Sequence, residues 1–385
     1  TGEDSPYPKG AYESYYSPYL DYFHFSKEEE KDWPENDSYE KWWGNDTLPK
    51  LNYENAPKLE AEILAIAKKW VSPPFSCDGW RLDVAADLGH SEAYNHRFWK
   101  KFRRAVKEAN EEAVILAEHY GNPSAWLKGQ EWDSIMNYDA FMEPVSWFLT
   151  GMEKHSDRAE PEKFGDGELF FNTMRYNMAK LPENALDAAM NQLSNHDHSR
   201  FLTRTNRRAG RMKDGFDDAG IGIDYGLFRL ASMLLFTWPG APTLFYGDEV
   251  GVYGWTEPDC RRPYPWGKED LELLEYHRYL ISHRKASPAL KNGNLMLLKS
   301  GKNWVSYLRC SENQIALIII YCGDEDCTLD IPLWRASITD KMEIRRVLKT
   351  DGRGYNAGQT KRYTENGILS SRLRAKTGKI YLIDF

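Results

Sequence analysis

The sequence feature that most constrains the fold of this chain is a short run in which charged and apolar side chains alternate. Residues 77–87 read CDGWRLDVAAD, and Arg81 and Asp83 stand two positions apart among apolar neighbours. Side chains two apart on a strand point to the same face. Burying a charged pair on an apolar strand is costly unless the charges serve each other or a polar site. The pattern favours either a structural Arg–Asp pair at a sheet rim or an ionised carboxylate held for chemistry, and spacing alone leaves both open.

Two later segments also end in acids. Residues 113–117 are apolar and lead into Glu118, and residues 192–195 lead into Asp197. Helical periodicity, clear over residues 91–108, separates such runs, and alternating strand and helix patterns predict a parallel α/β sheet or barrel. In barrels of this kind, side chains at the carboxyl ends of the strands meet at the active site. Paired carboxylates at such a place are typical of glycoside hydrolysis.

Motifs in a fixed order connect the sequence to a known family: GWRLDVA at 79–85, AE at 117–118, NHD at 195–197 and GAPTLFYGDE at 240–249. Each motif alone is weak, but together they are highly specific. The chain resembles the α-amylase superfamily (glycoside hydrolase family 13). Within that superfamily it is most similar to the neopullulanase, cyclomaltodextrinase and amylopullulanase group, and the resemblance extends over essentially the whole chain.

The resemblance implies chemical roles for the residues in these motifs. Asp83 is expected to be the nucleophile that forms a covalent glucosyl-enzyme intermediate, with Arg81 holding it ionised and oriented. Glu118 is expected to act first as general acid and then as general base. Asp197 and His196 are expected to bind the hydroxyl groups of the sugar beside the cleaved bond. The implied reaction is retaining hydrolysis, in which the two catalytic carboxyl groups lie about 5–5.5 Å apart.

The implied substrates are α-glucans, namely starch, pullulan, cyclodextrins or maltooligosaccharides, cleaved at α-1,4 bonds with α-1,6 cleavage left open. Residues 257–261 (EPDCR) resemble the family's Asp-Pro-x-x-Arg stretch, which makes Glu257 and Arg261 candidates for substrate binding. A salt-bridged loop is an equal alternative there, because Glu257 replaces the family's aspartate. The resemblance requires no cofactor. Calcium is common in the family, but no ligand for it can be named in this chain.

The expected fold class is α/β, a (β/α)8 TIM barrel followed by a C-terminal antiparallel β-sandwich. Residues 1–55 are irregular and aromatic, and they resemble the end of the loop domain that the family inserts after barrel strand 3. Residues 56–290 match barrel strands 4–8. Residues 291–385 predict the sandwich, because short β-type runs there are separated by turns. These runs are 295–298, 305–308, 315–321, 329–331, 344–348 and 380–383.

The family's first three barrel strands have no counterpart in this sequence. A sheet cut at strand 4 would leave an open edge and an uncovered core. We therefore expect barrel strands 1–3, the N-terminal remainder of the same protein, to be supplied by another chain or by a cleaved piece. Aromatic residues crowd residues 1–55, most densely around 42–49 (WWGNDTLP), and we expect at least one of these rings to border the substrate cleft.

Two rival function classes stay open. A metal-dependent hydrolase on a similar barrel would use the His-x-His form of residues 196–198, but no second histidine pair follows another predicted strand. A non-catalytic relative could bind glucan or serve as a partner subunit. Such relatives lack part of the carboxylate triad, whereas Asp83, Glu118 and Asp197 are all present here.

Composition limits the classes of binding partner that this chain can have. The net charge of −8 argues against nucleic acid and anionic membranes as partners, and no apolar run is long enough to span a bilayer. Aromatic residues make up 14% of the chain, which suits stacking on sugar rings as well as packing in a large core. The one basic stretch, from Arg200 to Lys213, is expected to be a solvated surface loop.

Overall fold

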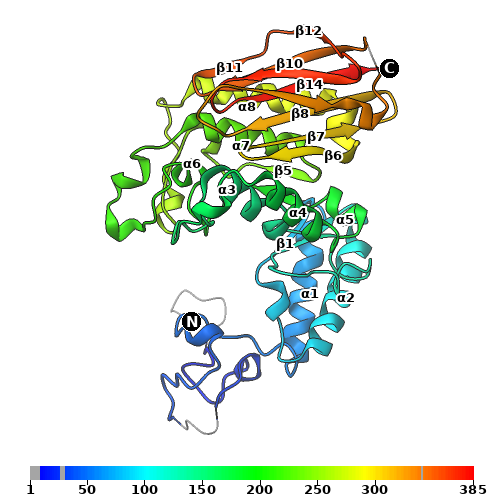
Figure 1. The fold of residues 1–385 in the computed structure, drawn as a ribbon. Coiled ribbons are helices and arrows are strands. Elements are labelled where there is room, and N and C mark those ends of the chain that lie inside the picture. The colour runs from blue at the N-terminus through cyan, green and yellow to red at the C-terminus, as the bar shows by residue number, and fades with distance from the viewer. Residues whose placement is uncertain (1–8, 27–30, 340) are drawn as a thin grey trace. The chain divides into compact units, whose positions relative to one another are not determined.

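The computed structural model describes residues 9–26, 31–339 and 341–385 (Figure 1). The chain divides into two compact units, Thr1–His119 with Pro123–Ile135, and Tyr120–Asn122 with Met136–Phe385. Among the described residues, no helix combines the length and the apolar character that crossing a bilayer requires.

The first unit contains a small parallel sheet and two long helices. Its strands are β1 (Gly79–Leu82), β2 (Val114–Ala117) and β3 (Ser134–Ile135), in the order β1-β2-β3. Its helices are α1 (Pro57–Val71) and α2 (Glu92–Ala109). The hydroxyl of Ser91 caps α2 by accepting from the Tyr94 N–H, and the helix buries one apolar face. That face carries Tyr94, Phe98, Trp99, Phe102 and Val106.

The chain before α1 has little regular structure. It forms the 3₁₀ turns η1 (Leu20–Tyr22) and η2 (Trp42–Gly44), together with isolated bridges such as Lys41 to Pro49. Trp43, inside η2, has a left-handed backbone with φ of 50° and is 81% exposed. This part of the first unit therefore presents aromatic rings on irregular backbone, as the sequence predicts.

The second unit begins with helices and a two-stranded parallel sheet. A π-helical turn (Tyr138–Met142) leads into the first of these helices, and Met136 forms a parallel bridge to Met190. The strands β4 (Met190–Gln192) and β5 (Ala241–Thr243) pair with each other. The helices are α3 (Glu143–Thr150), α4 (Gly167–Met178), α5 (Glu183–Asp187), α6 (Phe201–Arg204), α7 (Tyr225–Thr237), α8 (Leu271–Ala286) and α9 (Pro288–Asn292).

The C-terminal part of the second unit is antiparallel (Figure 1). A seven-stranded sheet has the order β11-β10-β14-β8-β7-β6, with β12 also paired to β10, and β9 pairs with β13 in a separate two-stranded sheet. The strand bounds are β6 (Asn294–Gly301), β7 (Trp304–Cys310), β8 (Gln314–Tyr321), β9 (Cys327–Pro332), β10 (Glu343–Asp351), β11 (Gly354–Asn356), β12 (Thr360–Tyr363), β13 (Ile368–Leu373) and β14 (Gly378–Asp384).

The large sheet is buried on both faces. On β8, Ile318 and Ile320 join the apolar cluster that also contains residues of α3, α4, α7 and α8. The alternate residues Leu317 and Ile319 pack in a second cluster with residues of β9 and β13. A strand buried on both faces reads as one continuous apolar run, which explains the sequence QIALIIIY. The C-terminal strands thus share a core with the helices of their unit.

Candidate active site

Asp83 and Glu118 follow the ends of two neighbouring parallel strands in the first unit. β1 pairs with β2 so that Leu82 lies opposite Ala117. The N–H of Glu118 extends this ladder by donating to the Leu82 carbonyl at 2.8 Å. Each acid therefore stands one residue beyond a paired strand end, at the same edge of the sheet.

One arginine connects the two acids. The Nη1 of Arg81 donates to Asp83 Oδ1, and its Nη2 lies 3.1 Å from Glu118 Oε2. A guanidinium has a planar fork of donors, so it can hold two carboxylates in fixed positions at once. The expected Arg81–Asp83 pair is present. The second contact could not be read from the sequence, because Glu118 is distant along the chain.

The two carboxylates differ in exposure. The Asp83 side chain is 75% exposed, whereas that of Glu118 is 11% exposed. An accessible carboxylate can approach a substrate carbon, and a shielded carboxyl group is held in a fixed position beside it. The two neighbouring acids are therefore suited to different chemical tasks.

The backbone just after Asp83 is strained. Val84 has φ of 44° and ψ of 41°, a left-handed conformation that is unfavourable for a β-branched residue. In this conformation its N–H donates to Glu118 Oε2 at 3.1 Å. The strained residue thus donates a hydrogen bond to the same carboxylate oxygen that is ion-paired with Arg81.

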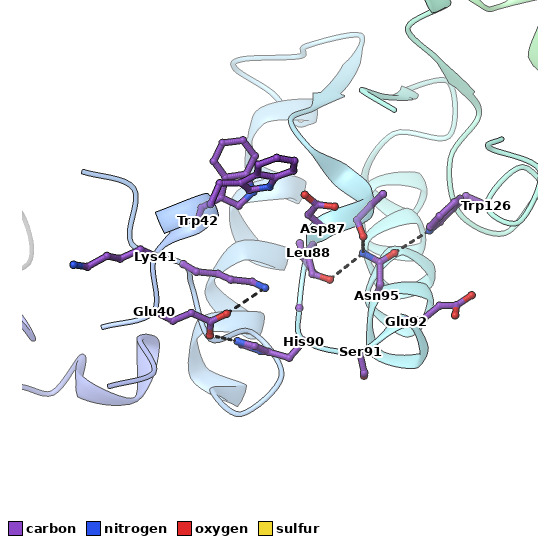
Figure 2. A pocket seen from close by; sticks show the side chains of 14 residues that line it. Glu40, Lys41, Trp42, Asp87, Leu88, His90, Ser91, Glu92, Asn95 and Trp126 are labelled. Carbon is purple, nitrogen blue, oxygen red and sulfur yellow. Dashed lines mark hydrogen bonds and ion pairs between the residues drawn. The ribbon is translucent and has the colours of Figure 1, made fainter. Parts of the chain in front are cut away.

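Asn95, on α2, fastens the loop that follows. Its buried amide nitrogen, which carries two hydrogens, lies 3.0, 3.1 and 2.9 Å from the carbonyl oxygens of Ala85, Ala86 and Leu88. Its amide oxygen accepts from the indole N–H of Trp126 at 2.9 Å, as Figure 2 shows. Loop carbonyls that would otherwise be buried without donors are satisfied in this way. Asn95 could not be singled out from the sequence, because one polar residue in an amphipathic helix carries no distinctive pattern.

Asp83 opens into a hollow of about 410 Å³ within the first unit. This size lies in the range of small-molecule sites, about 300–1,000 Å³. Its lining combines aromatic, aliphatic and acidic side chains, among them Trp42, Leu48, Tyr53, Asp83 and Asp87. Trp42, one of the aromatic residues in the irregular segment, lines this hollow together with Asp83.

In the second unit, Asn195 organises the segment that carries Asp197. The Asn195 side-chain oxygen accepts from the N–H groups of Asp197 and His198 at 3.0 and 3.1 Å. An asparagine that bonds its own following backbone forms a tight local turn. The turn leaves His196 and Asp197 partly exposed, with His196 Nε2 3.4 Å from Asp197 Oδ2.

His198 is buried and engaged at both ring nitrogens. Its Nδ1 lies 2.7 Å from the side-chain oxygen of Asn195, and its Nε2 lies 3.3 Å from the Tyr120 hydroxyl. Burial is the main cause that lowers the pKa of His198 to about 2, and the nearby His155 and Arg204 add to it. The imidazole is therefore neutral at working pH and already hydrogen-bonded, which leaves no lone pair directed at a metal.

One cluster in the described part of the chain has metal-like composition: Glu153, His155 and Asp157. Burial works against the charge of Glu153, but hydrogen bonds from His155 and from the backbone N–H groups of His155 and Asp157 lower its pKa to about 2. Asp157 pairs with Arg211. The oxygens of this cluster therefore already accept hydrogen bonds from protein donors. The cluster does not contain His196 or His198, the predicted His-x-His residues. It does not fit a calcium site, which needs several free oxygen ligands.

Arg261 lies beside the Asp197 segment. Its Nε donates to the His196 carbonyl at 2.8 Å, and its Nη2 lies 3.5 Å from Asp197 Oδ1. Glu257 is exposed, and its side chain makes no hydrogen bond or ion pair to the described residues. The acid that binds within this loop is Asp259, which accepts from the Trp255 N–H at 2.7 Å and pairs with Arg262 at 2.9 Å.

The expectation of a solvated basic loop over residues 200–213 was wrong at its start. Arg200 and Arg204 are fully buried. Arg200 pairs with Asp248 at 2.9 Å and donates to the carbonyls of Tyr246 and Cys260. Buried arginines persist where backbone carbonyls and a carboxylate replace their hydration. Arg200 therefore links the loop that contains Arg261 to the segment after β5.

Comparison with known proteins places these observations in a family context. The sequence matches the family described as Alpha amylase, catalytic domain, over residues 1–356. Neopullulanase 2 of Thermoactinomyces vulgaris is 34% identical over 287 residues, which cover 73% of this chain and 43% of that protein. A cyclomaltodextrinase of a Bacillus species is 32% identical over 277 residues, covering 71% of this chain and 43% of its own length. The chain thus spans less than half the length of these relatives.

Solved structures agree with this family context. The protein Ttha1563 of Thermus thermophilus is 26% identical and superposes with a TM-score of 0.77, covering 96% of this chain and 72% of that one. An acarbose-soaked debranching enzyme of Nostoc punctiforme is 26% identical with a TM-score of 0.72, covering 95% of this chain and 70% of that one.

Proposed function

This chain belongs to the α-amylase family of glycoside hydrolases, and we propose that it carries the catalytic carboxylates of a retaining enzyme that cleaves α-glucosidic bonds. The family match and the solved structures imply the architecture of a (β/α)8 barrel with a C-terminal β-sheet domain. The observation that supports the catalytic proposal most strongly is the Arg81 guanidinium joined to both Asp83 and Glu118. The three groups stand at the ends of adjacent parallel strands, where barrels of this kind place their chemistry.

In the proposed reaction, a carboxylate oxygen of Asp83 attacks the anomeric carbon and forms a glucosyl ester. Glu118 gives its proton to the departing glycosidic oxygen. It then removes a proton from the water that attacks the ester, which returns Asp83 and releases a product of retained configuration. Arg81 would hold the Asp83 carboxylate in position, and the contacts of Glu118 with Arg81 and Val84 would keep that carboxyl group in place.

Asp197, His196 and Arg261 are proposed to bind sugar hydroxyl groups. The support in this structure is local. The Asn195 turn presents Asp197 and His196 partly exposed, and Arg261 bonds the backbone between them. Glu257, in the place of the family's aspartate, is proposed to contact sugar on the same loop through its exposed side chain.

The proposed substrates are starch, pullulan, cyclodextrins and maltooligosaccharides, with cleavage of α-1,4 bonds and α-1,6 cleavage as an extension. The relatives named neopullulanase and cyclomaltodextrinase motivate this range. No cofactor is part of the proposed chemistry. A non-catalytic glucan-binding relative is the second candidate, and the intact Asp83, Glu118 and Asp197 argue against it.

We further propose that residues 56–290 supply barrel strands 4–8, that residues 1–55 end the loop domain, and that residues 291–385 form a β-sandwich. Among the described residues, β1 pairs only with β2, and β5 pairs only with β4. Strands 1–3, from an N-terminal piece of the same protein, would cover those edges. Co-expression with that piece should raise the melting temperature and confer activity, and full activity of this chain alone would exclude the assignment.

The proposed function is tested by product analysis with the completed protein. Maltoheptaose, pullulan and β-cyclodextrin should each be offered, and the anomeric configuration of fresh products followed by NMR. The expected products carry the α-configuration. Products of β-configuration would exclude the covalent intermediate, and tight binding without any cleavage would favour the glucan-binding alternative.

A further inference from the structure

Strands β10, β12 and β14 lie side by side in the C-terminal sheet of the second unit (Figure 1). Lys349 on β10 lies opposite Lys379 on β14. Arg346 on β10 lies between Tyr381 on β14 and Thr360 on β12. Residues directly opposite each other on paired strands point to the same face of a sheet. Because Tyr381 belongs to the apolar cluster shared with β9 and β13, the basic side chains are on the face that packs against those two strands.

Lys379 is the buried cation of this face, with only 8% of the residue exposed. Its Nζ donates to the Ser371 hydroxyl at 2.9 Å and to the Arg372 carbonyl at 2.8 Å, and both of these partners are neutral. A lysine is almost never buried unless its charge is paired. Among the described residues, however, no carboxylate forms an ion pair with Lys379. The buried charge therefore has hydrogen-bond partners but no counter-charge from the described chain.

The charges that act on Lys379 have the same sign as its own. Burial is the largest cause that lowers the pKa of Lys379 to about 8, and the charges of Lys349, Arg346 and Arg362 follow. Burial also raises the pKa of Tyr381, against the influence of the same two arginines. Both guanidinium groups are therefore close enough to influence Lys379 and Tyr381, and the region is electrostatically positive.

The acids of β10 are engaged with other partners. Asp351 pairs with Lys349 at 2.9 Å, and Glu343 pairs with a lysine of β12 at the same distance. Arg346 donates to a backbone carbonyl, and neither Arg346 nor Arg362 forms an ion pair within the part of the chain that the structure describes. Asp351 thus neutralises one of the cations, and the others keep their charge.

Two shielded polar atoms beside these cations have no hydrogen-bond partner among the described residues. They are the Nε of Arg346 and the Oγ1 of Thr360, which come from residues directly opposite each other on β10 and β12. Shielded polar groups in native proteins almost always have a partner. A guanidinium N–H and a hydroxyl group are both donors, and charge-assisted bonds from such donors are the ones that hold phosphate-like anions.

We propose that Arg346, Thr360, Arg362 and Lys379, the Lys379 cluster, form a binding site for a small oxyanion of the phosphate class. The anion accepts from the unpartnered Arg346 and Thr360 groups and neutralises the cations that have no carboxylate. Like charges held together destabilise a fold, and the bound anion relieves that repulsion. The phosphate group is either free phosphate or a monoester carried by a sugar, and the test distinguishes the two. The site contains none of the proposed catalytic or sugar-binding residues, so the inference goes beyond the proposed function.

The test is calorimetric titration of the completed protein with inorganic phosphate and, separately, with glucose 6-phosphate, at constant ionic strength. We expect saturable binding at one site and a melting temperature that rises with ligand concentration, because the ligand binds only the folded state. Arg362→Ala removes an exposed cation, so the fold should be unaffected and Kd should rise at least about fivefold. Lys379→Met should abolish binding. Arg372→Ala, which keeps the carbonyl that Lys379 contacts and removes a side chain that is 81% exposed, is the matched control and should bind as the wild type does.

The outcomes separate a specific site from a general salt effect. Tighter binding of glucose 6-phosphate than of phosphate supports the site with a sugar monoester as its ligand, and the reverse order supports it with free phosphate. The inference is overturned if neither probe shows saturable binding, or if Arg362→Ala and Arg372→Ala change Kd equally. A rise in melting temperature that chloride produces equally in all variants also overturns it, because that rise would be charge screening alone. The titration requires no glucan cleavage, so its result is independent of the proposed function.

Discussion

In the first unit, a side-chain cation holds the carboxylates of Asp83 and Glu118. In the second unit, Asp197 is positioned through a hydrogen bond to its backbone N–H. Arg81 contacts both Asp83 and Glu118, and it is only partly exposed. Asp197 is placed mainly by the turn in which Asn195 accepts from its N–H, and the nearest cation, Arg261, is half exposed and 3.5 Å away. The two regions therefore position carboxylates by different means.

The difference indicates which part of the reaction each region serves. A shielded cation shared by two carboxylates fixes their separation, which bond-breaking steps depend on. A carboxylate held by a backbone turn, with a loose solvated cation, is suited to hydrogen-bonding neutral hydroxyl groups. Changes in the first region should act on kcat, and changes around the second should act mainly on KM.

The largest expected effect comes from removing the acids of the first region. Asp83→Asn and Glu118→Gln each delete a catalytic group at almost constant volume, so kcat on maltoheptaose should fall by at least about a thousandfold. Circular dichroism should show an unchanged fold. Asp78→Asn, at an exposed acid just before β1, is the matched control and should stay near wild type. Near-native turnover of either acid variant would refute its catalytic role.

The next effect tests the shared cation. Arg81→Lys keeps the charge but loses the fork that reaches both carboxylates, and kcat should fall about a hundredfold. The acid and basic limbs of the kcat/KM profile should also shift, because the separation of the two carboxylates is no longer fixed. An unchanged rate and pH profile would make Arg81 a purely structural residue and remove the contrast between the regions.

Strands and helices with a strong local pattern could be predicted from the sequence. The helix expected over residues 91–108 is α2, and the continuous apolar run 315–321 lies within β8. The strands β11, β12 and β13 were missed, because they are short or rich in polar residues and contain no continuous apolar run. The separate C-terminal domain was expected from its β pattern alone, and pattern does not report that its large sheet shares a core with α7 and α8.

For the candidate site, strand-end acids were predictable and long-range contacts were not. Asp83 and Glu118 lie at paired strand ends as expected. The burial of Arg200 was missed, because its partners Asp248 and Cys260 lie far along the chain and a basic run reads as solvated. Asn95 was missed for the same reason, since only the folded loop shows that it contacts three carbonyls.

A smaller effect sharpens the description of the second region. Arg261→Ala should raise KM for maltooligosaccharides about tenfold and change kcat less than about threefold, because an exposed 3.5 Å ion pair contributes little to the position of Asp197. Steady-state kinetics with maltotriose and maltoheptaose would measure both constants. Arg278→Ala, at an exposed pair on α8, is a suitable control. A loss confined to kcat would show that Arg261 acts on chemistry and would blur the distinction between the regions.

The smallest effect on activity is expected from changing His198, which lies beside the Asn195 turn. The same change should also make stability depend differently on pH. Its pKa is about 2 in the folded state because of burial, against an ordinary value of 6.5. As pH falls below about 6.5 the unfolded chain takes up a proton that the folded chain does not, so stability is lost at about 1.4 kcal/mol per pH unit for this one group. His198→Gln removes that contribution while keeping a hydrogen-bonding side chain, and kcat should stay within about threefold.

The free energy of unfolding of the completed protein is measured with urea at pH 7, 5.5 and 4.5, for the wild type and for His198→Gln. The stability advantage of wild type over His198→Gln should shrink as pH falls. His277 is the matched control, because its pKa is lowered by burial to about 4 and it lies outside the Asn195 turn. His277→Gln should show the same trend over the narrower window between about 6.5 and 4, and should leave KM unchanged. If the His198 advantage were constant with pH, the folded and unfolded chains would bind protons equally at this residue, and burial would not be keeping the imidazole neutral.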